Sequence, residues 1–218
     1  IPDASTRLAA LRAAKIDFLG DRTVGSGALN WEEAASLKRT NPEIKQVEFP
    51  SEIDAICFRQ DKKELPIADV RVRQALSMAI NRQEMINTYY GGKAIIMNYP
   101  VAPIAELSDM YIPFEKLPPD IKVFYEYHLD KAKQFLADAG YPNGFKTDIV
   151  TVAADVDMLS IIKEYWKKIG VDLTISIKES AVHNTMVVVK KEYPELATFG
   201  RTQVNPLTFI GERPGYAY

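Results

Sequence analysis

Two kinds of hydrophobic spacing follow one another along most of the chain. Strand-like runs are rich in β-branched and aromatic residues, and the segments between them place apolar residues three and four positions apart. The predicted strands are 15–20, 43–49, 52–60, 146–153, 171–179 and 195–202, and the predicted helices are 6–15, 30–40, 69–88, 130–139, 155–169 and a last one that ends near 191. Strands that alternate with helices predict an α/β fold with a mostly parallel central sheet flanked by helices.

The helix predicted at 69–88 has an unusual arrangement of charge. Arg71 and Arg73 lie in its first turn, where the backbone amides already present partial positive charge. The two arginines either form a site for an anion or a substrate, or belong to the scaffold. Scaffold is the favoured interpretation, because the arginines project off an apolar stripe at positions 72, 76, 79 and 80 that predicts packing against the sheet.

Residues 93–127 contain several prolines and little periodicity, so a long irregular segment is predicted there. Long ordered loops are often functional. Aromatic residues gather in or near the predicted loops, Trp31 and Tyr99 among them, and together they suit a cleft that holds an extended or apolar ligand.

Composition excludes some classes of function. Of the 218 residues 47% are apolar and 26% charged, and the net charge of −2 gives no reason to expect nucleic acid or an acidic membrane as partner. Cys57 is the one cysteine, so an internal disulfide is excluded, and a buried inert thiol is the favoured interpretation. No apolar run approaches ~18 residues, and no signal peptide is visible. The abrupt start suggests a piece of a longer protein.

Signals for chemistry are few. His128 and His183 are far apart in sequence and lack the spacing of a metal site. There is no G-x-S-x-G motif, and "GSGALN" lacks the Lys-Ser/Thr ending of a phosphate loop. Asp155 and Asp157 are best explained as a solvated helix start. We therefore expect no catalytic residues, no metal and no cofactor, and predict that the protein is not an enzyme.

Two stretches resemble a known family. "PIADVRVRQALSMAINRQEMINTYYGGKA" (66–94) resembles the hallmark segment of the family 5 extracellular solute-binding proteins, the oligopeptide-, dipeptide- and nickel-binding components of ABC importers. "YHLDKAKQFLADAGYPNGF" (127–145) is similar to a second motif of that family. The likeness continues through "WKKIGVDLTI" (166–175) and includes "STRLAALRAAKIDFL" near the start, so that it covers nearly the whole chain.

The resemblance implies a periplasmic-binding-protein-like fold in which two lobes close around a solute. This chain resembles the second lobe, and the first lobe of the same protein is an expected partner. An ABC permease that receives a peptide or other small solute is the other partner that the resemblance implies. It also implies an extracytoplasmic location, either in the periplasm or anchored by lipid at the outer face of the membrane.

In peptide-binding members of the family, the last strand before the chain crosses between lobes reads roughly aromatic-x-x-Asp-x-x-Asp-Pro and contacts the ligand. Phe199 matches the aromatic position, but Thr202 stands where peptide binders carry the aspartate that pairs with an α-amino group, and Asn205–Pro206 replaces Asp-Pro. Burying an ammonium without a counter-charge is costly. Arg201 or Gln203 is therefore expected to meet an anionic or neutral polar ligand, although a surface salt bridge would equally explain Arg201. The expected ligand-binding residues are Phe199, Arg201, Thr202 and Gln203, with Trp31 and Tyr99 as wall residues.

Two other functions remain as alternatives at this point. Some transcription regulators carry a domain of this kind as a ligand sensor behind a DNA-binding head, but no helix-turn-helix or basic face is visible in this sequence. An enzyme on the same fold would need a nucleophile with its base, or a set of metal ligands, and neither is visible.

Overall fold

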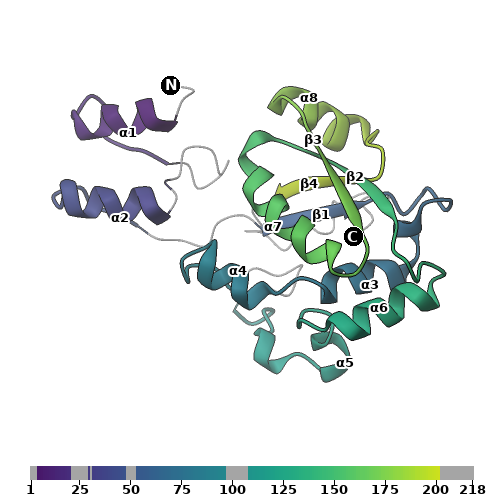
Figure 1. Cartoon of the computed structure of the whole chain (residues 1–218). Coiled ribbons are helices and arrows are strands. Elements are labelled where there is room, and N and C mark those ends of the chain that lie inside the picture. Colours follow the sequence, from purple (N-terminus) through teal and green to yellow (C-terminus); the bar gives the residue numbers. More distant parts are fainter. Residues whose placement is uncertain (1–3, 21–28, 30, 48–52, 97–107, 202–218) are drawn as a thin grey trace.

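The computed structural model describes residues 4–20, 29, 31–47, 53–96 and 108–201 (Figure 1). The α-helices of these ranges are α1 (Ala4–Arg12), α2 (Trp31–Thr40), α3 (Val70–Met78), α4 (Arg82–Thr88), α5 (Pro119–Lys122), α6 (Leu129–Asp138), α7 (Val156–Lys167) and α8 (Ser180–Asn184). The strands are β1 (Ile53–Phe58), β2 (Lys146–Thr151), β3 (Asp172–Ile177) and β4 (Leu196–Arg201). Short 3-10 helices lie at η1 (Pro66–Ala68), η3 (Phe114–Lys116) and η4 (Ala153–Asp155), and a π-helix, η5 (Thr185–Lys190), follows α8 directly.

The four strands form one sheet in the order β1-β4-β2-β3. β2 pairs in parallel with both β3 and β4, which confirms the mostly parallel sheet, whereas β1 pairs antiparallel with β4. Consecutive strands along the chain are joined by α7 between β2 and β3, and by α8 and η5 between β3 and β4. The sheet is therefore an α/β sheet with an antiparallel edge strand, an arrangement common in this class.

Different helices cover the two faces of the sheet. Ile149 of β2 and Leu196 of β4 belong to a large buried cluster with apolar residues of α3, α6 and α7. The next residues along each strand, Val150 and Ala197, instead pack with Val187 of η5. Because successive strand residues point to opposite faces, α7 and η5 must lie on opposite sides of the sheet.

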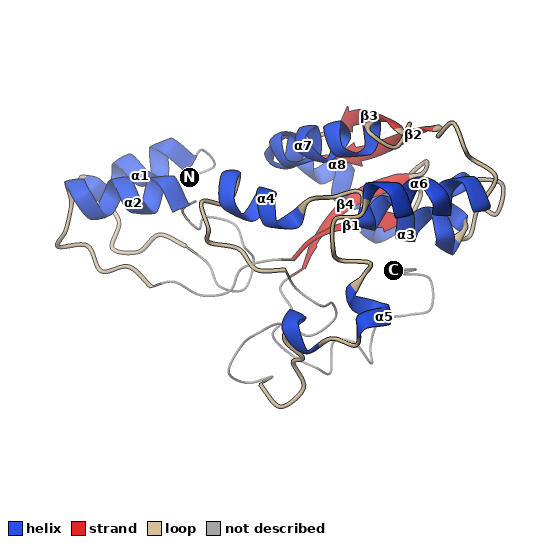
Figure 2. Ribbon diagram, turned by 60° about the horizontal axis from the view of Figure 1, so that its bottom comes forward, coloured by secondary structure: helices blue, strands red, loops and turns tan. Residues whose placement is uncertain are grey.

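Three helices pack together on the larger cluster. α3 and α6 lie side by side (Figure 2), and Trp166 of α7 is buried against α3, where its Nε1 donates a hydrogen bond to the carbonyl oxygen of Leu76 at 3.0 Å. α1 and α2 stand together to one side of the sheet (Figure 1). Arg12 of α1 donates a hydrogen bond to Oγ of Ser36 in α2 at 3.5 Å.

The single helix predicted at 69–88 is wrong, because two helices, α3 and α4, occupy that range. Asn81 caps the second helix: its side chain accepts a hydrogen bond from the Glu84 amide and donates one to the Glu84 carboxylate, at 3.1 and 3.0 Å. Arg82 then donates to the carbonyl oxygen and to Oγ of Ser77, at 2.9 and 2.8 Å, in the last turn of α3. Burial lowers the pKa of Arg82 to about 10. A reciprocal cap of this kind begins a new helix even where the apolar stripe continues.

Two predicted strands do not form in the part of the chain that the structure describes. Residues 15–20, and 43–47 of the predicted strand 43–49, adopt turns and irregular backbone. Phe18 and Val47 in these segments are 76% and 82% exposed. A strand needs a neighbour to accept and donate its ladder hydrogen bonds, and no described strand pairs with these segments.

The long segment predicted as irregular, 93–127, holds η3 and α5 in its described part. Residues 97–107 lie outside the described residues. None of the described helices is long and apolar enough to cross a membrane. That residues 1–218 form one lobe stays a prediction.

Candidate functional site

The carboxyl ends of β2 and β4 lie at a point where the chain connections diverge. After β2 the chain passes through α7 to β3, which is the neighbour of β2 on one side. After β3 it passes through α8 and η5 to β4, which is the neighbour of β2 on the other side. The two connections cover opposite faces of the sheet, as the two apolar clusters require. In open α/β sheets, ligands bind outside the carboxyl ends of strands at such a topological switch point.

Three polar side chains meet at this place. Thr151, the last residue of β2, is fully buried, and its Oγ1 lies 2.9 Å from Oγ1 of Thr198 in β4. The same Oγ1 donates a hydrogen bond to Oδ2 of Asp155 at 3.1 Å, just before α7 begins. We name Thr151, Asp155, Thr198 and Phe199 the switch-point edge. The carboxylate of Asp155 is therefore joined to the end of β2 directly, and to β4 only through the hydroxyl of Thr151.

Sequence reasoning missed the two threonines. It treated Asp155 as a solvated helix start, whereas the structure connects its carboxylate to the buried Thr151. A signal was present, because "IVTVA" and "LATFG" each place one threonine within an otherwise apolar or small run. What the sequence could not supply was the pairing of β2 with β4, which brings residues 47 positions apart within hydrogen-bond distance.

Phe199 lies on the opposite face of the sheet from Thr198. It is partly buried and packs on the cluster formed by Val150, Val187 and Ala197. The structure therefore places this predicted ligand residue near the carboxyl end of β4, where part of its ring packs on this cluster.

The other predicted residues of this strand are only partly described. Arg201 ends β4, where its backbone pairs with that of Ile53, and its side chain is not described. Thr202 and Gln203, together with Tyr99, lie outside the described residues. Their ligand-binding role stays a prediction.

Trp31 lies elsewhere, against the end of α4. Its Nε1 donates a 3.4 Å hydrogen bond to the carbonyl oxygen of Tyr89, and 41% of the residue is exposed. The indole lies flat over Gly91, where φ is +56° and an added Cβ would come within 3.0 Å of the ring. These contacts attach Trp31 to the end of α4 rather than to β4.

The two arginines of the hallmark segment are held by the scaffold. Arg71 forms an ion pair with Asp69, 2.6 Å from Nη2 to Oδ2, and its hydrogen bond lowers the pKa of that carboxyl. Arg71 also donates to the backbone oxygen of Asp138 at the end of α6. Arg73 donates to two consecutive carbonyl oxygens of η1, at 3.0 and 2.8 Å. Asp69 caps α3 by accepting a hydrogen bond from the Arg71 amide.

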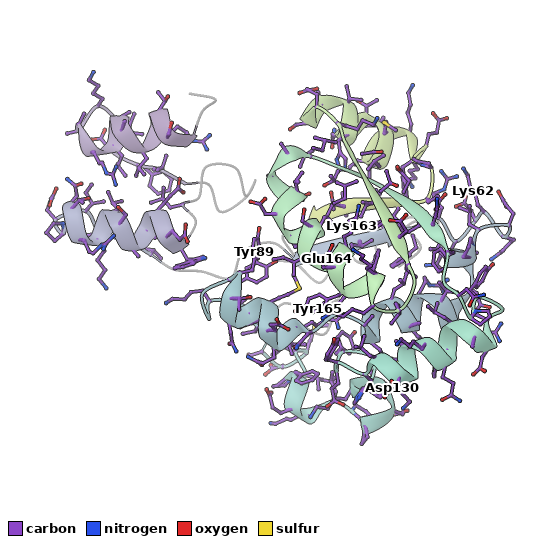
Figure 3. The ribbon with its side chains drawn as sticks, in the orientation of Figure 1. Lys62, Tyr89, Asp130, Lys163, Glu164 and Tyr165 are labelled. Atoms are coloured by element: carbon purple, nitrogen blue, oxygen red, sulfur yellow. The ribbon has the colours of Figure 1, made fainter. Side chains whose placement is uncertain are left out.

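A shallow groove of about 390 Å³ lies between α4 and α7, lined by Glu84, Ser160, Ile161, Glu164, Tyr165 and Lys168. Figure 3 shows Glu164 and Tyr165 on α7 beside this groove. Burial and a hydrogen bond to Glu84 raise the pKa of Tyr165 above its ordinary value, and Lys168 lies 4.9 Å from the centre of the Tyr165 ring. Phe199 and Trp31, the predicted ligand residues whose side chains the structure describes, do not line this groove. Within the described residues, no three side chains of His, Cys, Asp or Glu converge as a metal site would require.

Comparisons with known proteins place this arrangement in context. The sequence model described as "Bacterial extracellular solute-binding proteins, family 5 Middle" matches residues 1–206. Among curated proteins, heme-binding protein A of Haemophilus influenzae is 32% identical over 184 residues, which are 78% of this chain and 29% of that protein. The glutathione-binding protein GsiB of Salmonella typhimurium is 28% identical over 68% of this chain and 25% of its own length.

Solved structures show the same fold. DppA of Helicobacter pylori, in complex with the peptide STSA, is 28% identical with a TM-score of 0.62, over 93% of this chain and 36% of that one. HbpA2 of Haemophilus parasuis is 27% identical with a TM-score of 0.56, over 93% and 37%. The chain therefore spans between a quarter and two fifths of the length of these relatives.

Proposed function

Because this chain belongs to the bacterial extracellular solute-binding proteins of family 5, we propose that it is the second lobe of a two-lobed solute receptor of an ABC importer. The receptor captures a peptide or other small solute by hinge closure and delivers it to a permease. Solute binding shifts an equilibrium between open and closed forms, and the permease recognises the closed form. The relatives are solute-binding proteins, and no bond chemistry is part of the proposal.

The observation that carries the proposal is the family match over residues 1–206, which includes the whole sheet and the switch-point edge. Buried hydroxyls at the ends of β2 and β4, and a carboxylate bonded to one of them, support binding of a polar solute at this edge. In the proposed receptor, the first lobe closes over the switch-point edge. The location that goes with this role is the periplasm, or the outer face of the membrane through a lipid anchor.

Phe199, Arg201, Thr202 and Gln203 are the proposed solute-facing residues of this lobe, and Trp31 and Tyr99 are proposed wall residues. The relatives are named for heme and for glutathione, and DppA was solved with a peptide, so peptide-like solutes and flat apolar solutes are both candidates. Thr202 in place of an aspartate argues against a grip on a free α-amino group.

A thermal-shift titration of the intact protein that carries this chain tests the proposal. The solute panel comprises reduced glutathione, the peptides STSA and Met-Leu, the N-acetylated forms of both peptides, and hemin. We expect at least one solute to raise the melting temperature, because binding to the folded state stabilises it by mass action. Acetylation is expected to leave the shift of each peptide unchanged.

Two results would contradict the proposal at different levels. Strong stabilisation by free peptides that disappears on acetylation would overturn the argument from Thr202 and leave solute binding intact. A protein that no member of the panel stabilises, and that shows no retained solute by native mass spectrometry after purification from its host, would overturn solute binding itself.

A further inference from the structure

His183 contains a buried polar atom without a partner. The residue lies in α8, only 8% of its surface is exposed, and its Nε2 has no hydrogen-bond partner within the described part of the chain. More than nine in ten buried polar groups in folded proteins are paired, so an exception of this kind needs a physical reason. The hydrogen bonds of the switch-point edge do not involve this side chain.

The topology places His183 near the carboxyl edge of the sheet. α8 begins three residues after β3 ends, so its first turns lie at the same edge as the ends of β2 and β4. Val187, four residues further on, packs with Ala197 on the sheet face opposite to α7. Four residues of helix, from Val187 back to His183, rise about 6 Å toward the carboxyl edge of the sheet. Two residues of strand, from Ala197 on to Phe199, rise about 6.6 Å toward the same edge. His183 and Phe199 are thus at a similar height on the same face.

The helix that carries His183 is irregular directly after it. η5 begins at Thr185, and its π-type hydrogen bonding ends at Lys191, which has the left-handed φ of +57°. π-helices are rare and occur frequently at functional sites. A strained segment and an unpaired buried nitrogen therefore adjoin the face that holds Phe199.

We propose that His183 is a solute-contacting residue, and that its Nε2–H donates a hydrogen bond to a carbonyl or carboxylate oxygen of the bound solute. This inference rests on the proposed function and names one chemical feature of the solute. A neutral imidazole offers one donor and one acceptor, so the unpaired Nε2 is suited to such an oxygen.

The variant His183→Phe separates this role from a structural one. Phenylalanine fills a similar space and removes the unpaired nitrogen, so the melting temperature of the variant is expected to equal or exceed that of the wild type. Calorimetry measures its affinity for the panel solute that binds the wild type, starting with glutathione and the peptide STSA. This affinity is expected to fall about tenfold. His183→Gln, which keeps an N–H donor, should recover part of the affinity.

His128→Phe is the matched control, because His128 is the other histidine, is paired with Glu126 at 3.2 Å and lies at the start of α6. Its affinity should equal that of the wild type. Wild-type affinity in His183→Phe together with a lowered melting temperature would overturn the inference and leave the proposed function standing. If the wild type bound no member of the panel and also retained no solute in native mass spectrometry, the proposed function would fall and this inference would fall with it.

Discussion

Two threonine hydroxyls connect the ends of β2 and β4 in the interior of the protein. Thr151 and Thr198 are 0% and 4% exposed, so their hydroxyls bond to each other and not to water. The hydroxyl of Thr151 also bonds to Asp155. A buried hydroxyl that loses its partner keeps its desolvation cost, about 1–3 kcal/mol. This pair therefore fixes the geometry of the switch-point edge as well as contributing to stability.

Replacing either threonine by valine is expected to destabilise the fold by unequal amounts. Thr151→Val removes two hydrogen bonds and should lower the free energy of unfolding by about 1–3 kcal/mol, and Thr198→Val, which removes one, by about half of that. The double variant should cost less than the sum, because the two changes delete the same bond. Urea unfolding of the four proteins measures this, with the exposed Thr174→Val as control, expected within ~0.5 kcal/mol. Strictly additive losses would show that the two hydroxyls do not interact.

At the scale of single residues, the sequence predicted whether a side chain projects off the apolar stripe of its helix better than it predicted which residue that side chain bonds to. Helix spacing alone indicated that Arg71 and Arg73 project off the apolar stripe, and their bonds to Asp69 and η1 agree with a scaffold role. The hydroxyl pair at 151 and 198 could not be predicted, because it depends on which strands are neighbours and in what register.

Among the elements, the central strands and the helices between them were predictable. β2, α7, β3 and β4 each combine a strong periodicity with a clear boundary, and all four lie within two or three residues of their predicted ranges. The break between α3 and α4 was missed although its signal, Asn81 followed three residues later by Glu84, is a capping-box spacing. The antiparallel direction of β1 depends on long-range pairing, which periodicity does not encode.

One turn between elements depends on close backbone contact. Gly144 has φ +77°, and a Cβ at this position would lie 1.9 Å from the carbonyl oxygen of Gly170, in the turn between α7 and β3. The "YPNGF" turn and the segment before β3 therefore fit together only if position 144 has no side chain.

Gly144→Ala is expected to lower the free energy of unfolding by at least ~3 kcal/mol, because a left-handed φ and a clash with rigid backbone add together. Gly92→Ala is a matched control, since Gly92 has φ +76° but no atom of the described residues lies within 4 Å of an added Cβ. It should cost only the ~1–2 kcal/mol of the backbone conformation. Urea unfolding followed by circular dichroism compares the two variants. Equal losses of unfolding free energy would show that the backbone at Gly170 moves away from the new Cβ without destabilising the fold.

At the scale of the whole molecule, the described part of the chain holds one sheet, covered on one face by α3, α6 and α7 and on the other by η5, with α1 and α2 standing to one side. Its carboxyl edge holds the polar groups that the fold brings together, while the groove between α4 and α7 lies apart from them. The chain spans about a third of its structural relatives, which is why capture of a solute is proposed for the two-lobed protein and not for this lobe alone.

Hydrogen–deuterium exchange of the intact protein, with and without the panel solute that it binds, tests the placement of the site most directly. Solute is expected to slow exchange of the amides at 151–156, at the end of β2 and the start of α7, and at 196–201 in β4. Protection confined to 160–168, where α7 lines the groove, would contradict the assignment of the solute site to the carboxyl edge of the sheet.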